Sequence, residues 1–182
     1  MKIFNHKLIF VQMKTILLII FTGCLFVSCE HSQEISSISP INWEKRTLKN
    51  GLKDSLEIGK TYLSVYSQIY STTEHRKHGL TVTVSMRNTN LNDTIYINSA
   101  SYFDTEGNLT RTYFDKTIFL KPMETVEIVI DEMDEQGGTG ANFMFDWAMK
   151  KTSNEPLFEG VMISTSGQQG LSFTTQGRKI KH

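Results

Sequence analysis

The chain has 182 residues, and its 19 Lys and Arg residues balance 19 Asp and Glu residues. Lys2, Lys7 and Lys14 lie in a segment that we expect to be removed on export, which leaves 16 basic against 19 acidic residues (19 − 3 = 16). A mildly acidic chain without a clustered basic face is poorly suited to the phosphate backbone, so we expect no nucleic acid partner.

The first predicted element is a signal peptide over residues 1–28. Apolar residues fill positions 16–27 after Lys14, and the sequence becomes polar at Glu30. This is the order of charged, apolar and cleavage regions in a secretory signal. The alternative is a membrane-spanning helix, which needs about 18 uninterrupted apolar residues and would have to bury Lys14.

The segment LFVSC, which ends at Cys29, resembles a bacterial lipoprotein cleavage box. In such a box the cysteine is acylated, palmitate included, and becomes the new N-terminus. FTGC, which ends at Cys24, has a similar form, but cleavage there would leave apolar residues on the mature chain. We therefore predict lipid attachment at Cys29, which leaves no free thiol for disulfides, thiolate nucleophiles or cysteine-ligated zinc. Translation from Met1 and translation from Met13 both remain open.

We expect residues 29–59 to form a lipidated, polar tether and residues 60–180 to form the folded domain. After Lys60, hydrophobic residues recur at every second position, which is the pattern of half-buried strands. The clearest inward-facing sets are Leu80, Val82, Val84 and Met86 in GLTVTVSMRN, and Ala141, Phe143, Phe145, Trp147 and Met149 in ANFMFDWAMK.

Weaker alternation and intervening turn residues extend this pattern through the rest of the domain. Seven to nine short strands with almost no helical period predict an all-β fold, an antiparallel immunoglobulin-like β-sandwich. A β-barrel is the alternative architecture. The weaker segments are residues 61–70, 94–103, 108–114, 117–120, 125–130, 157–165 and 171–177.

Two glycine-rich loops, residues 135–140 and 166–170, are separated by two strands. Because connections alternate between the ends of an antiparallel sandwich, both loops are expected at one end. The turn at residues 104–107 and the predicted loop at residues 71–78 join them there if residues 109–120 form a single bent strand. If residues 109–120 form two strands, that turn and that loop lie at the opposite end.

Two clusters of polar residues could hold a metal, and each has a simpler interpretation. Glu74, His75 and His78 have a spacing that allows two imidazoles to reach one ion, but the two cationic residues between the histidines favour a solvated loop. Asp131 and Asp134 could bind calcium, but the alternating oxygen donors of a dedicated loop are absent. We expect an acidic strand end there.

Two further features concern hydrolysis and binding. Ser166 lies beside a glycine but outside a G-x-S-x-G elbow, which argues against a serine hydrolase. Tyr62, Tyr66 and Tyr70 fall on one face of a predicted strand. They form either an exposed aromatic row that suits a protein or glycan, or a row covered by the tether or the second sheet.

Several longer motifs together resemble the bacterial domain of unknown function 3124. They include ASYFDTEGNLTRTYFDK, and the most specific blocks are GGTGANF and GQQGLSF. The similarity spans about Tyr66 to Ile180. The resemblance implies no assigned activity and no catalytic residue. Members of that family are similar to small secreted or lipid-anchored envelope proteins.

These observations predict a lipid-anchored, non-enzymatic protein of the bacterial envelope, with a domain that faces the periplasm and needs no cofactor. Its expected partners are the membrane, through the lipid at Cys29, and an envelope protein or glycan. The alternative is a periplasmic sensor that binds a small ligand or a metal. Candidate contact residues for either function are Asp131, Asp134, Asn142, Gln168, Gln169 and Arg178.

Overall fold

The computed structural model describes residues 41–49, 51–52, 55–165 and 170–181. The chain divides into two units, and every described residue belongs to the second, residues 35–182. The predicted signal peptide and Cys29 lie outside the described residues. Within the described ranges, no helix is long and apolar enough to cross a membrane.

Twelve β-strands and one short 3-10 helix, η1, form the described part of the chain. The helix is Trp43–Arg46. The strands are β1 (Leu56–Val65), β2 (Gln68–Ser71), β3 (Thr73–Gly79), β4 (Thr81–Arg87), β5 (Ile95–Phe103), β6 (Leu109–Phe114), β7 (Ile118–Leu120), β8 (Thr125–Ile130), β9 (Ala141–Lys150), β10 (Leu157–Ser164), β11 (Leu171–Gln176) and β12 (Arg178–Ile180).

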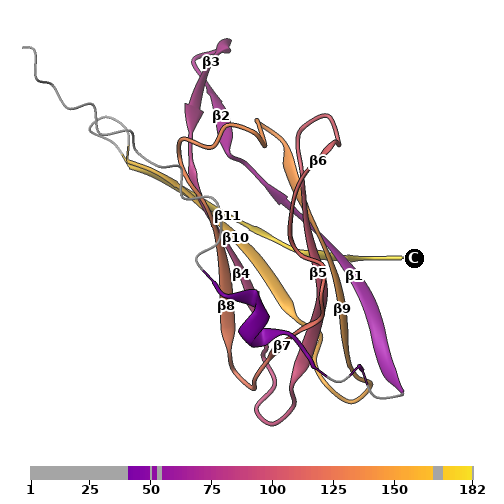
Figure 1. Cartoon of the computed structure of the whole chain (residues 1–182). Coiled ribbons are helices and arrows are strands. Elements are labelled where there is room, and N and C mark those ends of the chain that lie inside the picture. Colours follow the sequence, from indigo (N-terminus) through magenta and orange to yellow (C-terminus); the bar gives the residue numbers. More distant parts are fainter. Residues whose placement is uncertain (1–40, 50, 53–54, 166–169, 182) are drawn as a thin grey trace, which may run out of the picture. The chain divides into compact units, whose positions relative to one another are not determined.

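The strands form two antiparallel layers and a separate hairpin (Figure 1). One sheet has the order β12-β1-β9-β5-β6, with β7 also paired to β5, and the other has the order β11-β10-β4-β8. The hairpin β2–β3 extends beyond the two layers (Figure 1). The predicted all-β, antiparallel β-sandwich is therefore confirmed.

The strand count exceeds the predicted seven to nine for three reasons. The predicted strand at residues 61–70 divides into β1 and β2. The segment at residues 71–78, predicted as a loop, contains most of β3. The last strand, β12, has only three residues, which is too short to show a period of two.

The core lies between the two sheets and contains the inward-facing sets predicted from β4 and β9. All nine of those predicted residues are at most 3% exposed. The rings of Phe143 and Phe145 stack at 5.4 Å, and Phe158 from the opposite sheet continues the stack at 4.3 Å from Phe145. Alternation of buried and partly exposed side chains along β9 therefore aims its aromatic residues across the sandwich.

Part of the predicted tether belongs to the folded unit. Strand β1 begins at Leu56, so the sandwich includes residues 56–59, ahead of the expected boundary. Helix η1 lies beside β7, where Thr47 pairs with Ile118. The Trp43 ring packs 4.6 Å from the Phe114 ring, so the segment before β1 closes one side of the core.

The glycine-rich loop at residues 135–140 begins beside the end of β10, as the alternation of connections predicts. Residues 166–169 of the second glycine-rich loop lie outside the described residues. In the four-stranded sheet, Val82 pairs with both Ile130 and Met162, so β8 and β10 end side by side. Residues 109–120 form two strands, but β6 and β7 both pair antiparallel with β5 and act as one interrupted strand. The turn at residues 104–107 and the hairpin β2–β3 consequently reach the same end.

Candidate functional site

The outward side of the six-stranded sheet carries apolar and aromatic side chains that the core does not use. Along β1, Ile58, Lys60 and Tyr62 alternate with buried residues, and Ile58 is 61% exposed. Strand pairing places further side chains beside them. We call this surface the outer face, defined by Ile58, Lys60, Tyr62, Tyr96, Ser99, Ser101, Phe103, Leu109, Asn142, Met144, Asp146, Arg178 and Ile180.

A polar row crosses the middle of the outer face. The Lys60 Nζ lies 3.0 Å from Asp146 Oδ1, and the Ser99 hydroxyl donates to Asp146 Oδ2 at 2.8 Å. Both carboxylate oxygens are therefore engaged, and the row joins β1, β9 and β5. The side chains of Lys60 and Asp146 remain about one-third exposed, so this pair stabilises the fold only modestly.

A second row is centred on Tyr62. Its hydroxyl donates to the Asn142 side-chain carbonyl, and the Asn142 amide donates to the Gly140 carbonyl at 3.1 Å. Arg178 lies directly opposite Tyr62 on β12, and Met144 lies opposite on β9. The Arg178 side chain makes no hydrogen bond or ion pair with the described residues. Two predicted contact residues, Asn142 and Arg178, are thus brought together around Tyr62.

The chemistry of the outer face suits binding. Tyr62 and Met144 provide broad apolar contact, and the Arg178 guanidinium provides donors for a carboxylate, hydroxyl or carbonyl group. The polar row is already paired within the sheet. A surface that combines exposed aromatic side chains with an arginine free of ion pairs resembles the composition of protein recognition surfaces.

Comparison with known proteins agrees with the motifs. Residues 58–180 match the model of a family described as a protein of unknown function, DUF3124. The chain belongs to the DUF3124 family. The matched span covers all strands from within β1 to the end of β12, so the family domain is the sandwich itself.

The other two comparisons add less. No curated protein matches the chain. One solved structure, titled as the crystal structure of Thermotoga maritima 1070, is similar with 9% identity and a TM-score of 0.42, covering 66% of this chain and 92% of that chain.

The glycine-rich end of the DUF3124 domain contains a buried ion pair. Asp134, whose side chain is 2% exposed, lies 3.0 Å from Arg111 Nη2 and accepts the Gln136 N–H at 3.1 Å. Arg111 also donates to the Tyr113 hydroxyl at 3.0 Å. Burial raises the pKa of Tyr113, although the guanidinium opposes this change. Asp134 therefore holds its loop in place, while Asp131 accepts the Met133 N–H at the end of β8.

Glycine at position 137 is required by a close approach. A Cβ there would lie 1.8 Å from the Tyr102 hydroxyl and 2.8 Å from the Ala141 Cβ. The Tyr102 hydroxyl is buried without a hydrogen bond to the described residues, and the nearby Ser67 hydroxyl donates to the Gly138 carbonyl at 3.1 Å. Burial raises the pKa of Tyr102. Gly137 therefore serves to pack the loop against Tyr102.

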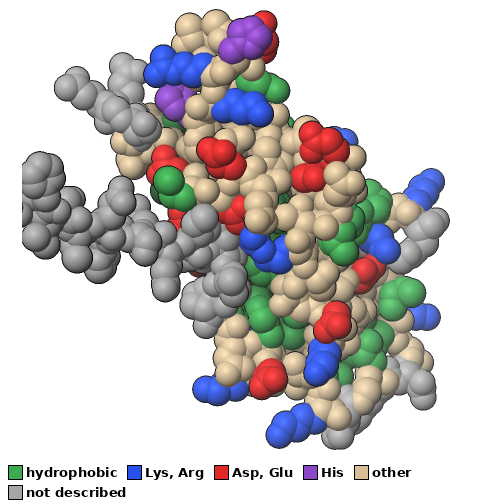
Figure 2. Space-filling model, turned by 45° about the horizontal axis from the view of Figure 1, so that its top comes forward, with side chains coloured by type: hydrophobic (Ala, Val, Ile, Leu, Met, Phe, Trp, Pro, Cys, Tyr) green, Lys and Arg blue, Asp and Glu red, His purple; other side chains and the backbone are tan. Residues whose placement is uncertain are grey.

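The hairpin β2–β3, which we call the arm, corrects the expectation of a solvated loop at residues 71–78. Ile69 pairs with His78 and Tyr70 pairs with Lys77. Both faces of β3 are open to solvent, so its sequence lacks a hydrophobic period. His75 lies 3.3 Å from Glu74, and both side chains are more than three-quarters exposed. Histidine and cationic side chains gather at this end of the molecule (Figure 2).

The three tyrosines do not form one row. Tyr62 belongs to the outer face, Tyr66 packs edge-on against Phe173 at 5.7 Å, and Tyr70 is 56% exposed on the arm. The row breaks because the chain leaves β1 at Val65 and enters the hairpin. Tyr62 and Tyr70 are therefore exposed, as one alternative predicted, whereas Tyr66 is covered by the second sheet, as the other predicted.

Some residues predicted as functional lie outside the described part of the chain, and one residue of the site was not predicted. Gln168, Gln169 and Ser166 lie outside the described residues. Within the described ranges, no group of three His, Cys, Asp or Glu residues lies close enough to hold a metal. Sequence reasoning missed Arg111, whose only signal was a charge at an inward-facing position of an edge strand.

Proposed function

We propose that this DUF3124 protein is a lipid-anchored protein of the bacterial envelope, with a non-enzymatic β-sandwich that binds an envelope protein or glycan. The observation that supports the binding role is the outer face. There, Tyr62 and Met144 lie beside Arg178, whose side chain forms no ion pair or hydrogen bond with a described residue. We assign the partner to this face, and we expect the domain to face the periplasm.

The anchor is the lipid predicted at Cys29. Each buried methylene contributes about 0.8 kcal/mol, so a single acyl chain binds only marginally and several chains are needed for stable attachment. Palmitate labelling of the wild-type chain is expected, and Cys29→Ala should abolish it. Cys24→Ala is the matched control and should keep the label. Labelling that persists in Cys29→Ala would refute the anchor.

The binding role can be tested by photo-crosslinking in cells. A benzophenone side chain at Met144 on the outer face should form a discrete adduct, whereas one at the exposed Thr174 on the opposite sheet should not. Arg178→Ala should weaken the adduct, and Arg76→Ala on the arm should leave it unchanged. Sensitivity of the adduct to protease or to glycosidase distinguishes a protein from a glycan. Equal adducts at both positions would contradict the proposal.

The alternative of a small-ligand sensor at the predicted contact residues has weaker support. Asp134 is paired with Arg111, whereas Asn142 is held by Tyr62 on the outer face. The described members of that set therefore occupy two separate surroundings.

A further inference from the structure

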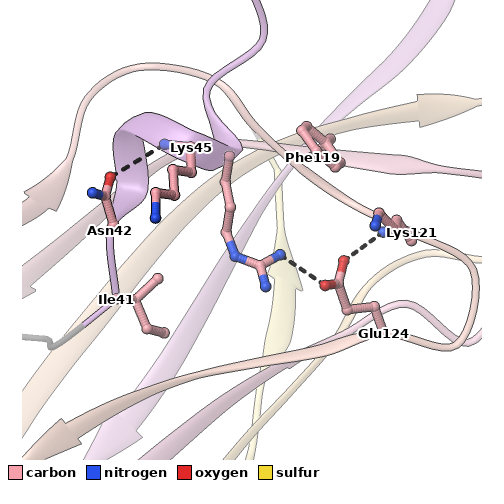
Figure 3. Close-up of a pocket in the computed structure, with 7 residues that line it drawn as sticks. Ile41, Asn42, Lys45, Phe119, Lys121 and Glu124 are labelled. Carbon is pink, nitrogen blue, oxygen red and sulfur yellow. Dashed lines mark hydrogen bonds and ion pairs between the residues drawn. The ribbon is translucent and has the colours of Figure 1, made fainter.

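A pocket of about 380 Å³ lies between η1 and the turn that joins β7 to β8 (Figure 3). Its volume falls within the range of about 300–1,000 Å³ typical of small-molecule sites. Helix η1 is held beside β7, because the Leu48 N–H donates to the Thr117 carbonyl at 2.8 Å. The Asn42 side chain caps η1 by accepting the Lys45 N–H at 3.2 Å. Both walls are therefore tied to the sandwich.

The pocket has an excess of positive charge. Lys45, Arg46 and Lys121 line it, and Glu124 is its single acidic residue, which leaves a net charge of +2 (3 − 1 = +2). Ile41 and Phe119 supply apolar wall. The pocket thus combines cations with a surface suited to an apolar group.

Glu124 is fully engaged by its neighbours. Its Oε1 lies 2.8 Å from Arg46 Nη1, and its Oε2 accepts the Lys121 backbone N–H at 2.8 Å (Figure 3). Partial burial opposes ionisation, but these two donors outweigh it and lower the pKa of Glu124. Glu124 is therefore ionised at neutral pH, and its carboxylate forms an ion pair with Arg46.

Lys45 and Lys121 have no ion-pair partner within the described structure, although the Lys121 charge also helps to lower the pKa of Glu124. Lys45 and Lys121 are exposed, and neither ammonium group forms an ion pair or hydrogen bond with a described residue. Arg46 and Glu124 cancel one another, so these two lysines account for the excess charge. Lysine ammonium groups bind phosphate well as point charges.

We propose that this pocket binds a phosphoryl group carried on an apolar body. A phosphate monoester has a charge of about −1.5 to −2 at pH 7, which matches the two lysines, whereas a single carboxylate would leave one unbalanced. Ile41 and Phe119 would contact the apolar part of the ligand. The site shares no residue with the outer-face contacts at Tyr62 and Arg178, although Phe119 pairs with Tyr96 at another part of that face. It does not require a lipid at Cys29.

The phosphoryl group could come from a membrane lipid or from a free metabolite. Ile41 follows Cys29 by 12 residues (41 − 29 = 12), which span at most about 42 Å when fully extended. If Cys29 is lipidated, the headgroups of the anchoring membrane lie within this reach. The test therefore separates the two sources.

The full chain in neutral-detergent micelles is titrated with phenyl phosphate, and binding is followed by calorimetry. Saturable binding is expected, with phenol as the uncharged control that does not bind. The titration is repeated in micelles doped with phosphatidic acid or with phosphatidylcholine. If phosphatidic acid weakens phenyl phosphate binding and phosphatidylcholine does not, the lipid headgroup competes for the pocket and the site is assigned to a lipid. If neither lipid changes phenyl phosphate binding, the site is assigned to a free phosphate ester.

Variants test whether the pocket is responsible. The double variant Lys45→Gln/Lys121→Gln should weaken phenyl phosphate binding at least about tenfold, because hydrogen bonds to charged groups are lost. The control Arg76→Gln/Lys151→Gln removes the same charge from the arm and from the end of β9 and should bind normally. Equal loss in both variants, equal binding of phenol, or absence of saturable binding in the wild-type chain would overturn the proposal.

Discussion

Gly59 is the position where the packing of the two central strands can be tested most sharply. It lies directly opposite Trp147 in the β1–β9 pair. A Cβ at position 59 would lie 2.1 Å from Trp147 Cζ2, 2.4 Å from Cη2 and 2.6 Å from Cε2. The Trp147 ring is 1% exposed and its Nε1 donates to Thr61 Oγ1 at 2.9 Å, so it cannot move without loss. Gly59→Ala should therefore force the indole out of place.

The expected loss has two parts. Overpacking a core typically costs about 1–3 kcal/mol. Loss of the Trp147–Thr61 hydrogen bond leaves a buried donor unsatisfied, which costs about 1–3 kcal/mol. We expect Gly59→Ala to lower the free energy of unfolding by about 3 kcal/mol, which corresponds to about 10 °C in Tm for a domain of this size.

Urea unfolding of the full chain, followed by circular dichroism, measures this loss. The control Gly170→Ala places its Cβ in open space and should change stability by less than about 0.5 kcal/mol. In a Trp147→Phe background, the shorter ring avoids the contact, so Gly59→Ala should cost less than about 1 kcal/mol. Equal costs in both backgrounds, or a negligible cost in the wild-type chain, would refute the packing argument.

Two further predictions concern charged pairs. Arg111→Leu leaves the buried Asp134 carboxylate without its cation and should lower the free energy of unfolding by about 3 kcal/mol at pH 7, measured by urea unfolding. Adding Asp134→Asn should recover more than about 1 kcal/mol, and additive losses in the double variant would contradict the prediction. The pKa of Glu124 is lower in the folded state than its ordinary value of 4.5, so ionised Glu124 stabilises the fold at pH values above 4.5. This contribution is lost as the pH falls through the folded-state pKa. Glu124→Gln should therefore reduce the change in the free energy of unfolding between pH 7 and pH 3 by about 0.2–1 kcal/mol, and an unchanged pH dependence would contradict the Arg46–Glu124 pair.

Alternation alone was enough to predict the sandwich core. Strand β9 has the bounds expected for ANFMFDWAMK, and its inward residues are buried. A period of two identifies a strand when one face is buried and the other is not. The same rule failed for β3 on the arm, because both faces of that strand meet solvent. Strand β12 was missed because three residues cannot show a period.

The candidate sites depended on contacts that no local pattern encodes. Asn142 and Arg178 were both predicted as contacts, but only the pairing of β1 with β9 and β12 places them around Tyr62. Asp134 was expected at an exposed acidic turn, yet the fold buries it against Arg111. Its partner is 23 residues away in the chain, so spacing gave no sign of the pair.

The sequence by itself determined the class of fold and the identity of the core, because burial of alternating side chains is a local property of each strand. The sequence also predicted that the loop at residues 135–140 lies at the end of the sandwich where β10 ends, because antiparallel connections alternate between ends. Tertiary structure decided which charged side chains form ion pairs within the fold and which remain available to bind a partner. Asp134 and Glu124 form ion pairs with cations far away in the chain, whereas the side chains of Arg178, Lys45 and Lys121 form no ion pair with a described residue. Such pairing depends on strand register and long-range packing.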